Sequence, residues 1–176
     1  MSPTVRSCTL RKLFYWQAPY SGLIIMLRNY RSMSQTKKKL PRGIRNNNPL
    51  NIRIGNNWRG EVSEPTDKQF EQFVSMEYGV RAAFIIIRNY IKKYNLNTIE
   101  KICSRWAPSS ENNTSMYINT VVNMSGIPRR RELKFEDFED MSNLFKGMCF
   151  AENGLIIKTS YIFDGYFLAR ASFQVI

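Results

Sequence analysis

RGIRNNNPLNIRI, residues 42–54, is the stretch from which the fold of this chain is best understood. Asparagine side chains compete with the backbone for hydrogen bonds, and the residue before a proline is disfavoured in a helix. The three consecutive asparagines before Pro49 therefore predict a turn or an extended loop, not the interior of a helix. Apolar residues around them indicate that the loop is anchored in a core: Ile44, Leu50, Ile52 and Ile54.

The amides of this loop allow two interpretations. They supply hydrogen-bond donors and acceptors without net charge, and they belong to Asn46, Asn47, Asn48 and Asn51. One interpretation is an Asn-rich surface turn. The other is a rigid loop whose amides line a groove for a ligand rich in hydroxyl and amide groups, such as a sugar. Trp58, in the turn GNNWRG (55–60), is either a lid on the core or a stacking platform for a sugar ring.

Positive charge is concentrated near the N-terminal end of the chain. The 176 residues, 43% of them hydrophobic, suffice for one domain with a packed core. The formal net charge is +12, yet no Asp or Glu precedes Glu61, and residues 61–176 hold 14 basic and 14 acidic residues. This near-neutral body argues against a nucleic-acid-binding domain, which would carry basic side chains across its folded surface. The basic segment could still contact polyanions such as wall polymers, phosphate or anionic lipid.

Histidine is absent, which excludes the catalytic triads and common metal sites that depend on it. Acid–base chemistry must therefore fall to Glu, Asp, Lys, Tyr or Cys. Cys8, Cys103 and Cys149 show no CxxC spacing, which favours a reducing folding environment over a disulfide scaffold. With no His, no clustered Cys and no Asp-rich loop, we expect neither a metal nor a cofactor.

The rest of the chain is predicted to be mainly α, and α+β at most. Residues 61–75 are interpreted as a short hairpin or an irregular extended segment. Residues 76–94 suit a central buried helix, because the middle of this stretch is apolar on all sides. Further helices are predicted from about 98 to 107, from 112 or 113 to 125, and from about 135 to 152. The second of these is expected to turn four side chains inward: Met116, Tyr117, Val121 and Met124.

Three parts are expected along the chain. Residues 1–40 form a basic N-terminal extension, interpreted either as disordered or as a mis-assigned start, with the functional protein beginning near Met33. Residues 41–154 form the main domain. Residues 155–176 are apolar and aromatic, and their sequence is compatible with either a helix or a strand.

A series of motifs in this order resembles a known family. The motifs are RGIRNNNPLNIR, WRG (58–60), FxxF (70–73), YGVRAA (78–83), NTIEKI (97–102), RWAP (105–108) and ENNTSMYI (111–118). Together they resemble the phage virion and prophage family of lysozyme-like proteins, often described as structural, peptidoglycan-degrading or lytic-transglycosylase-like. The resemblance covers about residues 40–154. Leu50 is a departure, because such proteins often carry Gly at this position.

The resemblance implies a small lysozyme-like helical domain that cleaves the glycan strands of peptidoglycan, as a lysozyme-type glycosidase or a lytic transglycosylase. Such cleavage needs a protonated carboxylic acid beside the glycosidic oxygen. Glu152 is the first catalytic candidate, because it ends an apolar helix in the sequence Glu-Asn-Gly, which resembles the catalytic helix end of lysozyme-like transglycosylases. Apolar surroundings also raise the pKa of a carboxyl. Glu61 is the second. The alternative interpretations are a solvated helix end for Glu152 and an exposed turn for Glu61.

The substrate-binding candidates are Asn46, Asn47, Asn48, Asn51, Trp58 and Tyr117, with Trp106 either a sugar contact or part of the core. We expect a phage-encoded protein that is made in the bacterial cytoplasm and acts at the cell wall. Its expected partners are bacterial peptidoglycan and, if the chain is a virion component, other virion proteins; nucleic acid is not expected. The alternative is a non-catalytic virion structural or wall-binding protein with the same fold.

Overall fold

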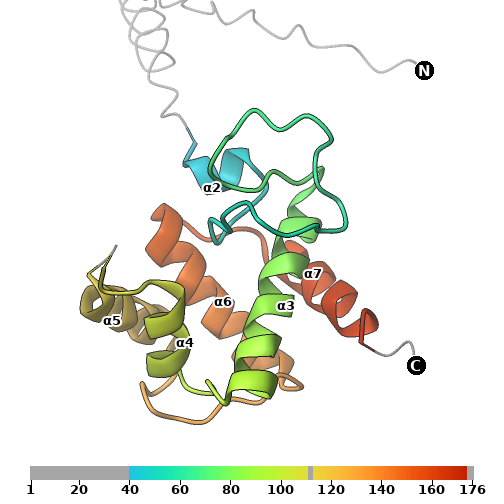
Figure 1. Ribbon diagram of the computed structural model, residues 1–176. Helices are drawn as coiled ribbons and strands as arrows, with labels where there is room; N and C mark the ends of the chain where they lie inside the picture. The colour runs from blue at the N-terminus through green and yellow to red at the C-terminus, as the bar shows by residue number, and fades with distance from the viewer. Residues whose placement is uncertain (1–39, 111–112, 174–176) are drawn as a thin grey trace, which may run out of the picture. The chain divides into compact units, whose positions relative to one another are not determined.

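The regular structure is helical, which confirms the mainly α fold expected from the sequence. The computed structural model describes residues 40–110 and 113–173. The helices shown in Figure 1 are α2 (Arg42–Arg45), α3 (Met76–Tyr94), α4 (Ile99–Trp106), α5 (Thr114–Ser125), α6 (Phe138–Asn153) and α7 (Thr159–Ala171). Within this part of the chain, none of the helices has the length and apolar character that crossing a membrane requires.

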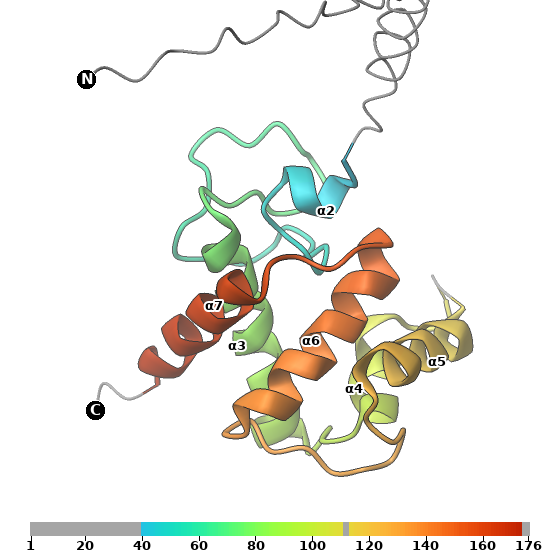
Figure 2. The same cartoon turned by 180° about the vertical axis from the view of Figure 1, so that it is seen from behind.

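Helix α3 is the centre of the packed core. Helix α7 packs along it, and α5 packs against α6 (Figures 1 and 2). The ring of Phe84 on α3 lies 5.0 Å from the ring of Phe145 on α6 and 5.3 Å from that of Tyr166 on α7. Tyr166 is fully buried, and its hydroxyl donates a hydrogen bond to the backbone oxygen of Phe135 at 2.7 Å. Aromatic contacts therefore join α3, α6 and α7 without leaving the tyrosine hydroxyl unsatisfied.

An irregular extended segment connects α2 to α3, as predicted for residues 61–75. Its pairing consists of two isolated antiparallel bridges, Arg53 with Phe70 and Glu61 with Phe73. Leu50, the departure from the family pattern, is fully buried. The Asn-rich loop is therefore attached to the core by an apolar side chain and to the following segment by backbone hydrogen bonds.

The inward orientation predicted for two methionines of α5 is wrong. Met116 is 66% exposed and Met124 is 38% exposed, whereas Ile118 and Val121 are buried. The cause is the narrow contact of α5, which packs on α4 and α6 and leaves its outer side to solvent. Helical spacing places apolar residues near the contact, but it does not fix how wide the buried face is.

The C-terminal segment, whose sequence was compatible with a helix or a strand, forms the helix α7, which packs on α3. Helix α2 is an addition to the sequence prediction: four residues after Pro41 form a single turn before the asparagines. The N-terminal extension predicted for residues 1–40 lies outside the described residues except for Leu40.

Gly79 allows α3 to approach the Asn-rich loop. A Cβ atom at this position would lie 1.8 Å from the backbone oxygen of Asn47. Such a contact is far inside van der Waals distance, so any side chain here would push the helix and the loop apart. Glycine at the first turn of α3 is therefore required by packing against the loop.

We predict that Gly79→Ala lowers the free energy of unfolding by about 1–3 kcal/mol, the usual cost of overpacking. Alanine is otherwise better than glycine inside a helix by up to about 1 kcal/mol, so the sign of the change is informative. Urea denaturation measures it, with Lys93→Ala at the exposed end of α3 as the control, expected to change stability by less than about 0.5 kcal/mol. A Gly79→Ala protein as stable as wild type would contradict the close approach.

Candidate active site

Glu152 lies in the last turn of α6, where three other parts of the chain meet it. The side-chain amide of Asn51 donates a hydrogen bond to its Oε2 at 2.8 Å. The hydroxyl of Tyr117, on α5, donates to its Oε1 at 3.0 Å. The side chain of Trp106, at the end of α4, is a third hydrogen-bond donor to this carboxyl. The loop, α4, α5 and α6 thus converge on one acidic group.

Burial and hydrogen bonding act on the pKa of Glu152 in opposite directions. Burial disfavours the charged carboxylate and raises the pKa, and this is the largest effect. The hydrogen bonds from Asn51, Tyr117 and Trp106 favour the charged form and lower it, but the net result is a pKa above the ordinary value of 4.5. The pKa of Tyr117 is in turn raised well above 10.0, by burial and by the nearby Glu152. A carboxyl with such a pKa is suited to hold and transfer a proton.

The two buried cysteines near this carboxyl are poor nucleophiles. Burial raises the pKa of Cys103 to about 12 and that of Cys149 to about 11, and the charge of Glu152 adds to both shifts. The thiolate is the reactive form of cysteine, and at neutral pH very little of either residue is in that form. The chemistry of this site therefore falls to Glu152.

The Asn-rich loop is fixed to the end of α6 by side-chain hydrogen bonds. Asn153, next to Glu152, donates to the backbone oxygens of Pro49 at 2.7 Å and Cys149 at 3.0 Å. A Cβ atom on Gly43 would lie 2.7 Å from Oδ1 of Asn153 and 2.8 Å from Oδ1 of Asn51. Only glycine leaves room here for both amides, so α2 closes over the loop and holds Asn51 towards Glu152.

The first three asparagines of the run bond to the protein itself. Asn48 is fully buried and donates to the backbone oxygens of Ile52 at 2.9 Å and Glu71 at 3.0 Å. Asn47 donates to the backbone oxygen of Phe73 at 2.9 Å, and Asn46 donates to the carboxylate of Asp67 at 2.8 Å. These bonds give the three amides a role in shaping the loop, and their predicted contact with a sugar stays a prediction.

Backbone conformation gives a further reason for asparagine in this loop. Asn47 and Asn51 both have a φ of 50°, in the left-handed region that asparagine tolerates better than most residues. At Asn51 this conformation coincides with the hydrogen bond to Glu152. Of the four loop asparagines predicted to contact a sugar, Asn51 is therefore the one whose side chain reaches Glu152.

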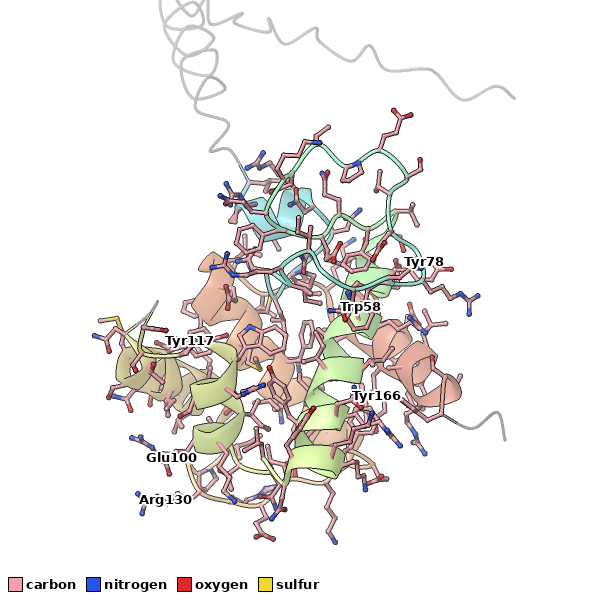
Figure 3. The ribbon with its side chains drawn as sticks, viewed as in Figure 1. Trp58, Tyr78, Glu100, Tyr117, Arg130 and Tyr166 are labelled. Carbon is pink, nitrogen blue, oxygen red and sulfur yellow. The ribbon has the colours of Figure 1, made fainter. Side chains whose placement is uncertain are left out.

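Trp58 and Glu61 form their own turn, away from this convergence. The backbone N–H of Trp58 donates to Oε1 of Glu61 at 2.5 Å. In Figure 3, Trp58 lies beside the upper half of α3, whereas Tyr117 lies on the side formed by α4 and α5. Within the described residues, Glu61 and Glu152 share no hydrogen-bond partner. The structure thus brings Asn51, Tyr117 and Trp106 together with Glu152, but not Glu61.

Glu71 is a buried carboxyl that the sequence reasoning missed. It is 6% exposed, and its pKa is raised by burial first and by the neighbouring Glu61 second. Backbone hydrogen bonds from Gly55 and Asn56 partly oppose the rise. Its place between two phenylalanines, in FEQF, is the sequence signal that could have indicated burial.

A pocket of about 350 Å³ opens between α5 and the end of α6, and its lining includes Ala151 and Gly154, on either side of Glu152 in the chain, but not Glu152 itself. Its lining residues are Asn113, Met116, Tyr117, Thr120, Phe150, Ala151 and Gly154. Tyr117 both lines this pocket and donates to Glu152. A molecule bound there would therefore lie next to the residue that contacts the acid. Among the described residues, no group of three or more His, Cys, Asp or Glu side chains is gathered as metal coordination would require.

The sequence of this chain is similar to that of a known phage protein. Protein P5 of Pseudoalteromonas phage PM2 is 48% identical to this chain over 101 residues, which is 55% of this chain and 63% of the phage protein. The chain spans less than two thirds of the length of that relative, whose name states no activity. No model of a known protein family matches the sequence. The similarity agrees with the expected phage origin and leaves the activity to be proposed from the site.

We predict that Glu152→Gln becomes more stable relative to wild type as pH rises above about 4.5. The raised pKa means that the native state binds this proton more tightly than the unfolded state, so ionisation at higher pH costs the wild type stability. The variant carries no proton that must be lost. Urea denaturation of both proteins from pH 4 to pH 8 measures the difference, and a gap that stays constant or moves in the opposite direction would contradict the raised pKa.

Proposed function

We propose that this protein cleaves the glycan strands of bacterial peptidoglycan, with Glu152 as the general acid and base. The single observation that supports this most is the environment of Glu152, a largely buried carboxyl with a raised pKa that is contacted by the Asn-rich loop and by Tyr117. Tyr117 also lines a pocket. The sequence resemblance to lysozyme-like phage proteins gives the class of substrate. Similarity to a phage protein agrees with that origin.

In the first step, the protonated carboxyl of Glu152 gives its proton to the glycosidic oxygen as the bond from that oxygen to the sugar C1 breaks. The raised pKa keeps a larger share of this carboxyl protonated near neutral pH than an exposed glutamate would have. The hydrogen bonds from Asn51 and Tyr117 strengthen as the carboxylate forms, because donors bind an ionised acceptor more tightly. The charge that remains on the enzyme is thus stabilised where it develops.

The second step favours a lytic transglycosylase over a hydrolase. Hydrolysis usually needs a second carboxylate placed to act on water or on the sugar. Glu61, the second catalytic candidate from the sequence, is hydrogen-bonded within its own turn and, in the described part of the chain, shares no hydrogen-bond partner with Glu152. In the alternative chemistry, the 6-hydroxyl of the muramic sugar attacks C1 and passes its proton back to Glu152. A single glutamate then serves as acid and base, and an anhydro-sugar product results.

A second candidate function has its own support in the same hydrogen bonds. Glu152 accepts hydrogen bonds from three donors, so the residue also links α4, α5 and the loop as a structural acceptor would. A non-catalytic wall-binding or virion structural protein would keep this link and bind insoluble peptidoglycan without releasing soluble fragments. The release of fragments therefore distinguishes the two functions.

We predict that purified wild-type protein clears a suspension of isolated peptidoglycan and that Glu152→Gln lowers the rate by about 100-fold or more. This is the usual range for the loss of a general acid–base residue. Glu132→Gln, at an exposed position before α6, is the matched control and should clear the suspension at the wild-type rate. Folding of each variant is checked by circular dichroism. Clearing by Glu152→Gln at the wild-type rate, or a folded wild type that does not clear, would refute the proposal.

We further predict that Tyr117→Phe shifts the alkaline limb of the pH–activity profile to higher pH. The tyrosine hydroxyl lowers the pKa of Glu152, so its removal lets the pKa rise further and keeps the acid protonated to higher pH. A merely structural tyrosine would lower the activity at every pH by the same factor. An unmoved profile, or one displaced to lower pH, would show that the hydroxyl does not act on the catalytic carboxyl.

A further inference from the structure

A basic rim lies beside the candidate active site, on α2 and on the loop that faces it. It consists of Arg42, Arg45, Arg53 and Lys68. A polar pocket of about 380 Å³ lies at its centre, lined by Arg42, Arg45, Lys68 and Asp67 among others. The guanidinium carbons of Arg42 and Arg53 lie 5.0 Å and 5.3 Å from the centre of the Phe70 ring. Stacking on one ring orders two of the four cations.

The acidic residue that lines this pocket does not cancel its charge. Asp67 accepts hydrogen bonds from Asn46 and from the backbone of Gln69 and Phe70, and it lies 3.5 Å from Arg42. Because of these bonds its pKa is lowered, and it stays ionised as part of the internal structure. The pocket therefore keeps a net positive charge with Asp67 already paired.

Two of the cations are available to a ligand. Nε of Arg45 donates to the backbone oxygen of Leu40 at 3.1 Å, and Nζ of Lys68 donates to that of Pro65 at 3.4 Å. Both residues are exposed, and neither forms an ion pair with another residue of the described ranges. A neutral carbonyl satisfies one donor but leaves the charge unbalanced, so both side chains can bind an anion.

The rim is continuous with the candidate site through α2. Gly43, between the two arginines of this helix, packs directly against the amide oxygens of Asn51 and Asn153. Asn51 donates a hydrogen bond to Glu152, and Asn153 is the residue that follows Glu152 in the chain. A polymer bound at Glu152 would therefore extend past α2 and within reach of its arginines.

We propose that the basic rim binds the free carboxylates of the peptide stems of peptidoglycan while the glycan strand lies at Glu152. This inference rests on the proposed function, because it takes the same polymer as substrate. The charge pattern favours this anion: the folded body holds equal numbers of acidic and basic residues after position 60, so the positive charge is local. A local patch suits the spaced carboxylates of short peptides, whereas nucleic acid would require basic side chains across a wider surface.

The test measures binding to insoluble peptidoglycan in the Glu152→Gln background, so that the polymer is not consumed. The rim variant is Arg45→Glu with Lys68→Glu. The control is Lys93→Glu with Lys101→Glu, which changes the net charge equally at the end of α3 and the start of α4, far from α2 in Figure 1. We expect the rim variant to bind about tenfold more weakly than its parent, equivalent to about 1.4 kcal/mol, and the control to bind within about twofold of it.

A second polymer identifies the anion. On peptidoglycan whose free carboxylates have been converted to neutral amides with a carbodiimide and ammonia, the rim variant and its parent should bind equally. The proposal would be overturned if the rim and control variants lost binding to peptidoglycan equally. It would also be overturned if the rim variant bound peptidoglycan as tightly as its parent. Rim-dependent binding to duplex DNA or to anionic phospholipid vesicles that is tighter than binding to peptidoglycan would also overturn it, because phosphate would then be the ligand. If the rim variant binds peptidoglycan more weakly but the wild type releases no soluble fragments, the proposed cleavage is refuted and the proposed role of the rim stands.

Discussion

The hydrogen bond from Asn51 to Glu152 joins two residues that are 101 positions apart, and the geometry of the site depends on it. The loop must present an amide in a left-handed backbone conformation, and α6 must end where its carboxyl can receive it. Gly43 leaves the space for this contact, and Asn153 fixes the loop to the same helix end. The buried amide of Asn48 holds the loop in shape from within.

The state of Glu152 follows from a balance between burial and hydrogen bonding. Moving a carboxylate out of water costs several kcal/mol, whereas a hydrogen bond to a charged group is worth about 1.5–3 kcal/mol. The two effects are of similar size, and burial is the larger one at Glu152, so the protonated form is favoured more than in water. This balance suits a group that must give up a proton and take it back. Asp67 also accepts three hydrogen bonds, but burial is not the largest effect there and Arg42 lies 3.5 Å away, so its pKa is lowered.

The sequence predicts the helices well because their signals are local. The apolar pattern of α3 and the glycines that end α5 and α6 place these helices within a few residues of where they lie. The position of Glu152 at a helix end follows from the same signals. Local patterns do not say which way a loop amide points, so the four asparagines were indistinguishable until the structure directed Asn51 to the acid and the others inward. The exposure of Met116 and the burial of Glu71 depend on neighbours distant in sequence.

The most direct measurement is the pKa of Glu152, followed by carbon-13 NMR of protein labelled at the glutamate carboxyls and assigned with Glu152→Gln. A buried acid held by three donors should titrate clearly above 4.5, and its pKa should rise further when Tyr117 is replaced by phenylalanine. A Glu152 carboxyl that titrates at or below 4.5 would contradict this balance. It would leave the residue a structural acceptor instead of a catalytic acid.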